Sequence, residues 1–186
     1  MIKIGKSTAK AIINAPLEAV NLGEWMFTIT SDEYAACAEG HQSAAQGKLA
    51  SGKRVSVNVE IVSGMFMIQH YIENIAERSH VLAISPNTIF WLNDTNYVLT
   101  HITWELGVTI IDENSCELTC SVISETENEA FVKRRQEAMK DLPANHNPAQ
   151  QHIDEETPLF AKDIERKALA GVWSLKTIKN SLLQKA

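Results

Sequence analysis

The stretch RVSVNVEIVSGMFMIQHYIEN, residues 54 to 74, decides the fold. Its first half alternates strictly, so Val55, Val57, Val59 and Ile61 share one face of a strand while Ser56, Asn58 and Glu60 share the other. Ser63-Gly64 suits a two-residue hairpin turn. That turn pairs Val57 with His70 and Ile61 with Phe66, so the apolar rows of both strands meet on one face. We therefore predict a hairpin whose inward face carries Val57, Val59, Phe66, Ile68 and His70.

Three further segments read as strands: HVLAIS (80–85), NYVLTHITWELGVTII (96–111) and CELTCSVIS (116–124). The connection at 112–114 pairs Ile110 with Cys116 and keeps the apolar faces in phase. The inward row of the longer strand is predicted to hold Thr100 and the apolar residues Val98, Ile102, Trp104, Leu106, Val108 and Ile110. The inward row of the last strand is predicted to hold Cys116, Leu118, Cys120 and Val122.

Helices are predicted on both sides of these strands. A first strand at 7–14 is followed by short helices at 16–22 and at 32–39, the second capped by Ser31. Thr126-Glu127-Asn128-Glu129 has the form of a capping box and predicts a helix at about 127–141. A polar, proline-containing loop follows, and Thr157-Pro158 then predicts the start of a helix of about seven turns. Its apolar stripe comprises Ala161, Ile164, Ala168, Val172, Leu175, Ile178 and Leu182.

This order of elements predicts an α+β fold. One-sided strands need a cover, and a long amphipathic helix needs a wide apolar partner, so we expect a curved antiparallel sheet wrapped around the C-terminal helix. The length of 186 residues suits a single domain, residues 1–186, with 127–156 as an extra helix and loop before the last helix. Such a grip is expected to leave an internal cavity between the helix and the sheet.

Composition narrows the functional classes. The net charge of −6 disfavours sequence-independent binding of nucleic acid, which needs basic side chains against the phosphates. Neither a signal peptide nor a membrane-spanning stretch is apparent. The three cysteines fit a reducing compartment better than a disulfide framework, and Cys116 and Cys120 are too far apart along one strand to form a bridge. We expect a cytoplasmic protein with free thiols.

The sequence resembles the START-like, or SRPBCC, superfamily, which has the helix-grip fold. INAPLEAV (13–20) is similar to its first strand and following helix, and HITWEL (101–106) is similar to a later strand that often carries a tryptophan. Asn21 stands where the superfamily usually has a tryptophan, and Trp25 lies four residues on. The resemblance implies an internal cavity for an apolar or amphipathic ligand, and it does not imply a reaction.

The expected ligand site is the inward apolar surface, with His70 as its central question. His70 is either a core histidine bonded to a neighbour or a polar handle that orients a ligand, and Trp104 is either core or cavity wall. The inward rows as predicted contain no Asp, Glu, Lys or Arg, which favours a binder over an enzyme. The predicted ligand-binding residues are Val57, Val59, Phe66, Ile68, His70, Ile102, Trp104, Leu118 and Cys120.

No catalytic residue, metal ligand or cofactor site is predicted. The sequence lacks the common catalytic motifs, and its six histidines show no metal-binding spacing; His146 and His152 are interpreted as solvated loop residues. Met65, Met67 and Tyr71 fall on the outer face of the hairpin, which favours a homodimer or an overlay by another segment. The alternatives to a small-molecule binder are a cyclase/dehydratase-type enzyme and a co-chaperone-like module that binds a protein partner.

Overall fold

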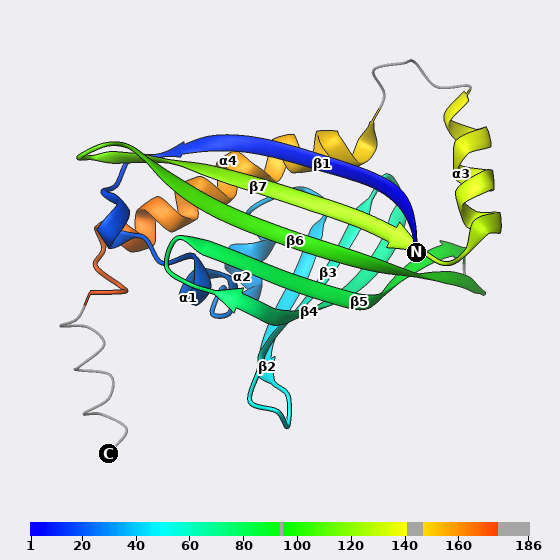
Figure 1. The fold of residues 1–186 in the computed structure, drawn as a ribbon, viewed down its shortest axis with the longest axis horizontal. Coiled ribbons are helices and arrows are strands. Elements are labelled where there is room, and N and C mark those ends of the chain that lie inside the picture. The colour runs from blue at the N-terminus through cyan, green and yellow to red at the C-terminus, as the bar shows by residue number, and fades with distance from the viewer. Residues whose placement is uncertain (94, 141–146, 175–186) are drawn as a thin grey trace.

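The computed structural model describes residues 1–93, 95–140 and 147–174. The described residues form one antiparallel seven-stranded sheet in the order β1-β7-β6-β5-β4-β3-β2, with the long helix α4 lying along one face of it (Figure 1). The strands are β1 (Ile2–Ile13), β2 (His41–Lys48), β3 (Arg54–Val62), β4 (Met65–Ala76), β5 (His80–Asn93), β6 (Asn96–Asp112) and β7 (Ser115–Thr126). The predicted α+β helix-grip architecture is therefore confirmed.

The predicted hairpin registers are also confirmed. Val57 pairs with His70 and Ile61 with Phe66, about a turn in which Ser63 and Gly64 both have positive φ, 53° and 74°. Positive φ at both central residues gives the turn a twist that matches the two strands, and glycine adopts it without steric cost. The 112–114 connection pairs Ile110 with Cys116, as expected.

The face assigned to β3 and β4 is wrong. The concave face carries Ser56, Asn58 and Glu60 from β3 and Met67, Gln69 and Tyr71 from β4, and all six side chains are buried. The row that contains Val57, Val59, Phe66, Ile68 and His70 lies on the convex face, where Ile61 is 41% and Phe66 38% exposed. Alternation correctly predicts which residues share a face. The prediction that the apolar face points inward is wrong, because the inner face of this hairpin carries polar residues. Met67 and Tyr71, which were predicted to lie on the outer face and to contact a second copy or another segment, therefore lie inside.

The residues predicted to face inward from β6 and β7 do so at most positions. Ile102, Trp104 and Leu106 are buried on the concave face, as are Leu118 and Cys120 of β7. Ile110 departs from the prediction with 65% exposure, because β6 runs beyond the core there into the β6–β7 turn.

Three short helical segments follow β1. They are a 3-10 helix at Leu17–Ala19, α1 (Leu22–Met26) and α2 (Ser31–Ala35). Thr30, not Ser31, caps α2, because its hydroxyl accepts from the Glu33 amide while the Glu33 carboxylate accepts from the Thr30 amide. Gly23 lets α1 approach β4 closely, since a Cβ there would lie 2.7 Å from the Ala76 carbonyl oxygen. Strand β2 was not predicted because HQSAAQGK lacks β-branched and aromatic residues.

The last two described helices are α3 (Glu129–Lys140) and α4 (Pro148–Leu169). Asn128 begins α3 by accepting from the Phe131 amide, whereas the Thr126 hydroxyl donates to the Leu99 carbonyl. Helix α4 starts ten residues before the predicted position, with Asn147 as its cap and Pro148 in its first turn. Pro158 is inside the helix on its exposed side, where the missing amide leaves a carbonyl open to water. The predicted stripe residues Leu175, Ile178 and Leu182 lie outside the described residues.

The core lies between α4 and the concave face. Trp25 packs edge-on against Phe160 of α4, with ring centroids 5.0 Å apart, and Trp104 of β6 contacts both rings. The Trp25 indole also donates to Asp163 of α4 at 2.8 Å, which fixes α1 against the helix. None of the described helices has the length and apolar character needed to cross a membrane.

Candidate functional site

Two histidines and two glutamates meet in the interior near the start of α4. His41 is the first residue of β2, Glu60 lies near the end of the neighbouring β3, and His152 and Glu156 stand one turn apart on α4. Because antiparallel pairing places His41 opposite Glu60 and α4 crosses that end of the sheet, residues 115 positions apart come together. We call these four residues the quartet.

The quartet is compact and buried. His41 Nε2 lies 3.0 Å from Glu156 Oε2 and 3.5 Å from Glu60 Oε2. His152 Nε2 lies 3.3 Å from each of the same two oxygens. The side chains are between 0% and 12% exposed, so two carboxylates and two imidazoles lie together almost fully shielded from bulk solvent.

Burial and the charges of neighbouring residues shift the pKa values of His152 and Glu60 in opposite directions. Burial alone would lower the pKa of His152, but the hydrogen bonds and charges of Glu156 and Glu60 outweigh it and raise that pKa to about 10. Burial would raise the pKa of Glu60, but His152, His41 and Gln69 hold it below its ordinary value. Without another cation in the site, His152 is thus an imidazolium at neutral pH and partly balances the two carboxylates.

Neighbouring side chains orient the quartet. The ring of Tyr34 in α2 stacks on His41 with centroids 3.9 Å apart, and its hydroxyl donates to Glu60 at 3.0 Å. Burial and the charge of Glu60 raise the pKa of Tyr34, so its hydroxyl keeps the proton that it donates. The Gln69 amide donates to the other oxygen of Glu60, and His41 Nδ1 lies 2.8 Å from the Tyr34 carbonyl.

A row of polar side chains crosses the concave face beside the quartet. Asn58 of β3 pairs with Gln69 of β4, and Thr88 of β5 pairs with Thr100 of β6. Gln69 lies beside Thr88, because the residues next to them, Ile68 and Ile89, pair between β4 and β5. All four are at most 3% exposed. Asn58 Nδ2, Gln69 Oε1 and Thr100 Oγ1 have no hydrogen-bond partner among the described residues. Buried polar atoms are nearly always paired, so these three point to a polar group or water that binds there.

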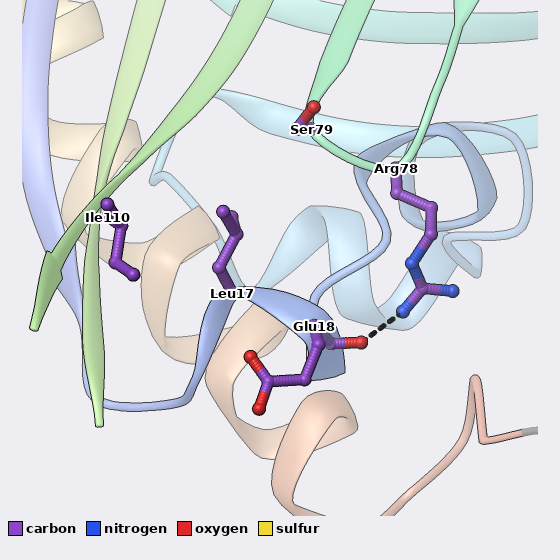
Figure 2. Close-up of a pocket in the computed structure, with 5 residues that line it drawn as sticks. All are labelled: Leu17, Glu18, Arg78, Ser79 and Ile110. Atoms are coloured by element: carbon purple, nitrogen blue, oxygen red, sulfur yellow. Dashed lines mark hydrogen bonds between the residues drawn. The ribbon is translucent and has the colours of Figure 1, made fainter. Parts of the chain in front are cut away.

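Two surface hollows formed by the described residues lie outside the space between the sheet and α4. One is an open surface hollow at the end of the β6–β7 hairpin, lined by Leu17, Glu18, Arg78, Ser79 and Ile110, where Arg78 donates to the Glu18 carbonyl at 2.6 Å (Figure 2). A second lies beside Arg54 and Phe27, whose guanidinium and ring are 4.8 Å apart. Between sheet and helix, Trp25, Trp104 and Phe160 fill the middle of the interior.

The predicted ligand-binding residues separate into two groups. Ile102, Trp104, Leu118 and Cys120 line the interior, and the Trp104 indole donates to the Cys120 sulfur at 3.2 Å. On the convex face lie Val57, Val59, Phe66, Ile68 and His70, so His70 is not an interior polar handle. The premise that the interior lacks carboxylates is also wrong, because Glu60 and Glu156 are inside it. His152, interpreted as a loop residue, belongs to α4.

Sequence reasoning missed all four quartet residues. His41 lies in the strand that was not predicted, and Glu60 was placed outside because polar residues on an alternating strand usually face water. One local signal was present: His152 and Glu156 are four residues apart, the spacing that puts two side chains on one helical face.

Comparisons with known proteins support the fold. No protein-family model and no curated protein matches the sequence. The structure is similar to the Zhui aromatase/cyclase of Streptomyces sp. R1128, with a TM-score of 0.58 and 10% identity over 88% of this chain and 94% of that one. TTHA0849 of Thermus thermophilus gives a TM-score of 0.56 and 11% identity over 89% and 98%.

A third similar structure is StfQ, a di-domain aromatase/cyclase of the steffimycin biosynthetic pathway. It gives a TM-score of 0.53 and 8% identity over 91% of this chain and 53% of that one. At these identities the likeness concerns the fold alone, and the chain has the helix-grip fold.

Proposed function

We propose that this protein binds a small hydrophobic or amphipathic molecule between the concave face and α4. One observation carries the proposal: the polar row holds three fully buried atoms without a partner among the described residues, on the face that the grip encloses. Tyr71 follows Gln69 on the same face of β4, and Trp104 lies on the same face of β6 as Thr100. A ligand with one polar and one apolar end would place its polar end at the polar row and its apolar end against the aromatic rings.

The packing limits the size of the ligand. Because Trp25, Trp104 and Phe160 already contact one another, we infer a small molecule that bonds to the polar row and rests its apolar part against these rings. The similar structures support only the enclosing shape, and the aromatase/cyclase activity in the names of two of them does not follow from it.

Native mass spectrometry of the purified protein tests the proposal, with an excess mass that disappears on denaturation as the expected result. A naphthalene-type dye and hydroxylated or acidic analogues then measure binding to two variants. Thr100→Val, on the concave face of β6, should weaken the hydroxylated ligand; Thr103→Val, on the convex face of the same strand, should not. No excess mass and equal affinities in both variants would mean that the row holds only water.

The quartet favours a second candidate function, a cyclase/dehydratase-type enzyme acting on a polyketide-like or aromatic substrate. It places imidazoles beside carboxylates in a buried site, the combination that general acid–base catalysis uses. Loss of water from a β-hydroxyketone, followed by absorbance, distinguishes this candidate from simple binding. Turnover that depends on Glu156, tested as Glu156→Gln, would support it, and binding without turnover would exclude it.

We infer that the protein works in a reducing compartment, the cytoplasm. Cys37, Cys116 and Cys120 are all free and buried, and burial raises the pKa of each thiol. Labelling of the native and the unfolded protein with a thiol reagent checks this: three reactive thiols should appear only after unfolding.

A further inference from the structure

We propose that His41, Glu60, His152 and Glu156 bind one divalent transition-metal ion, with Zn²⁺ as the best match. The proposal goes beyond the binding of an organic molecule and does not depend on it. The donor atoms of the quartet all lie within 4.8 Å of one another.

The nitrogen–oxygen distances among the donor atoms suit a tetrahedral ion. Zinc bonds to imidazole nitrogen and carboxylate oxygen are about 2.0–2.2 Å long, so neighbouring ligand atoms of a tetrahedron are about 3.3–3.6 Å apart. The four nitrogen–oxygen distances in the quartet are 3.0, 3.3, 3.3 and 3.5 Å. The two remaining pairs, nitrogen with nitrogen and oxygen with oxygen, lie within 4.8 Å of one another, so these atoms have to approach by up to about 1 Å to enclose an ion as a tetrahedron.

The hydrogen bonds of His41 leave the correct nitrogen available. A backbone carbonyl can only accept, so the 2.8 Å contact with the Tyr34 carbonyl makes Nδ1 the donor. The other nitrogen, Nε2, then faces the oxygens of Glu60 and Glu156, which also present lone pairs. Only a proton or a metal ion between these atoms makes the arrangement favourable. A carbonyl that fixes the tautomer of a ligating histidine is the usual support at metal sites.

The Glu60 carboxylate is oriented in the same way. Gln69 donates to Oε1 of Glu60, and this leaves Oε2 directed at the two histidines. The stacking of Tyr34 on His41 holds the imidazole plane. Two ligands therefore come from neighbouring strands of the sheet, and the other two, His152 and Glu156, come from successive turns of α4.

The charge and chemistry of the quartet select the kind of ion. Two carboxylates with two neutral imidazoles carry a charge of −2, which a divalent ion neutralises in a site that is almost fully buried. Imidazole nitrogens suit zinc, iron and other transition metals, whereas magnesium and calcium prefer oxygen ligands alone. The absence of thiolates from the set argues against copper(I).

Zinc and cobalt titrations test the proposal. Protein freed of metal by a chelator should bind one Zn²⁺ per chain in competition with a chromophoric chelator. Co²⁺ should give the intense visible absorption of a tetrahedral centre. Glu60→Gln and His41→Gln should each weaken Zn²⁺ by at least about 100-fold, and Gln69→Leu, which removes only a supporting bond, by roughly 10–100-fold.

A matched control is provided by His80 and Glu105, a second histidine–glutamate pair 2.9 Å apart but exposed at the surface. His80→Gln should leave Zn²⁺ affinity and stoichiometry unchanged. Where a quartet variant fails to fold, the stoichiometry and the Co²⁺ spectrum of the unaltered protein decide. Less than one ion per chain at saturation, a weak octahedral Co²⁺ spectrum, or equal affinities in His41→Gln and His80→Gln would overturn the proposal.

Discussion

Glu60 lies near the end of β3, and its carboxylate faces the imidazoles of His41 and His152. The carboxylate of Glu156 contacts the same two imidazoles. Its neighbours on the concave face, Asn58 and Gln69, are polar and buried as well. Burying so many polar groups in a sheet costs free energy unless partners satisfy them. Their presence on the enclosed face is therefore the residue-level basis for the ligand and the metal ion proposed to bind there.

Trp104 is the residue that connects the core aromatic rings. It contacts Trp25, Tyr71 and Phe160, with centroid distances of 6.4, 5.1 and 5.6 Å. We expect Trp104→Ala to lower the free energy of unfolding by about 3–5 kcal/mol, because it removes a large buried ring and leaves a cavity. Urea denaturation measures this. Trp91→Ala on the half-buried convex side should cost less, and an equal loss in both variants would contradict the assignment.

At the scale of elements, α2 and α4 are joined by charge. Glu33 of α2 accepts from both Lys167 and Arg166 of α4 at 2.7 Å, and within α4 Asp163 orients Lys167 at 3.2 Å. These bonds hold the C-terminal half of α4 against α2, which also supplies Tyr34 to the quartet. The position of the site therefore depends on this pairing of helices.

The charged contact gives a prediction about pH. Burial raises the pKa of Glu33, but bonds from Lys167, the Thr30 amide and Arg166 outweigh it and lower the pKa from 4.5 to about 2. A carboxyl with a lowered pKa in the folded state stabilises the fold above its unfolded-state pKa, and this contribution is lost as the pH falls through about 2. Between pH 4.5 and 2, Glu33→Gln should lose less stability than the unaltered protein, measured by urea unfolding at each pH. Parallel curves for the two proteins would refute it.

At the scale of the whole molecule, the convex face carries a continuous row of apolar side chains. Ile61 pairs with Phe66, and Ile68 pairs with Ile89, which pairs with Leu99, so apolar side chains run without a break across β3 to β6. Leu99 is 46% exposed. Exposed apolar patches commonly mark an interaction surface, and two copies can pair through the same patch about a two-fold axis.

A homodimer through the convex face is the resulting prediction. Light scattering should give twice the chain mass of 20.7 kDa. Phe66→Glu should produce a monomer, because two facing carboxylates would be buried near the axis. Ile110→Glu, at an exposed apolar position on the β6–β7 hairpin, is the control and should stay dimeric. A monomeric unaltered protein would rule the interface out.

The sequence by itself determined the order of most elements, the two hairpin registers and the buried rows of β6 and β7. These follow from side-chain periodicity and turn chemistry, which act between close neighbours in the chain. Periodicity established that Val57 and His70 share a face, but whether that face lies inside depends on which side α4 covers. The tertiary structure also decided the meeting of His41 and Glu60 with His152 and Glu156, because the distance between two side chains remote in sequence is set by how the sheet curves and where the helix crosses it.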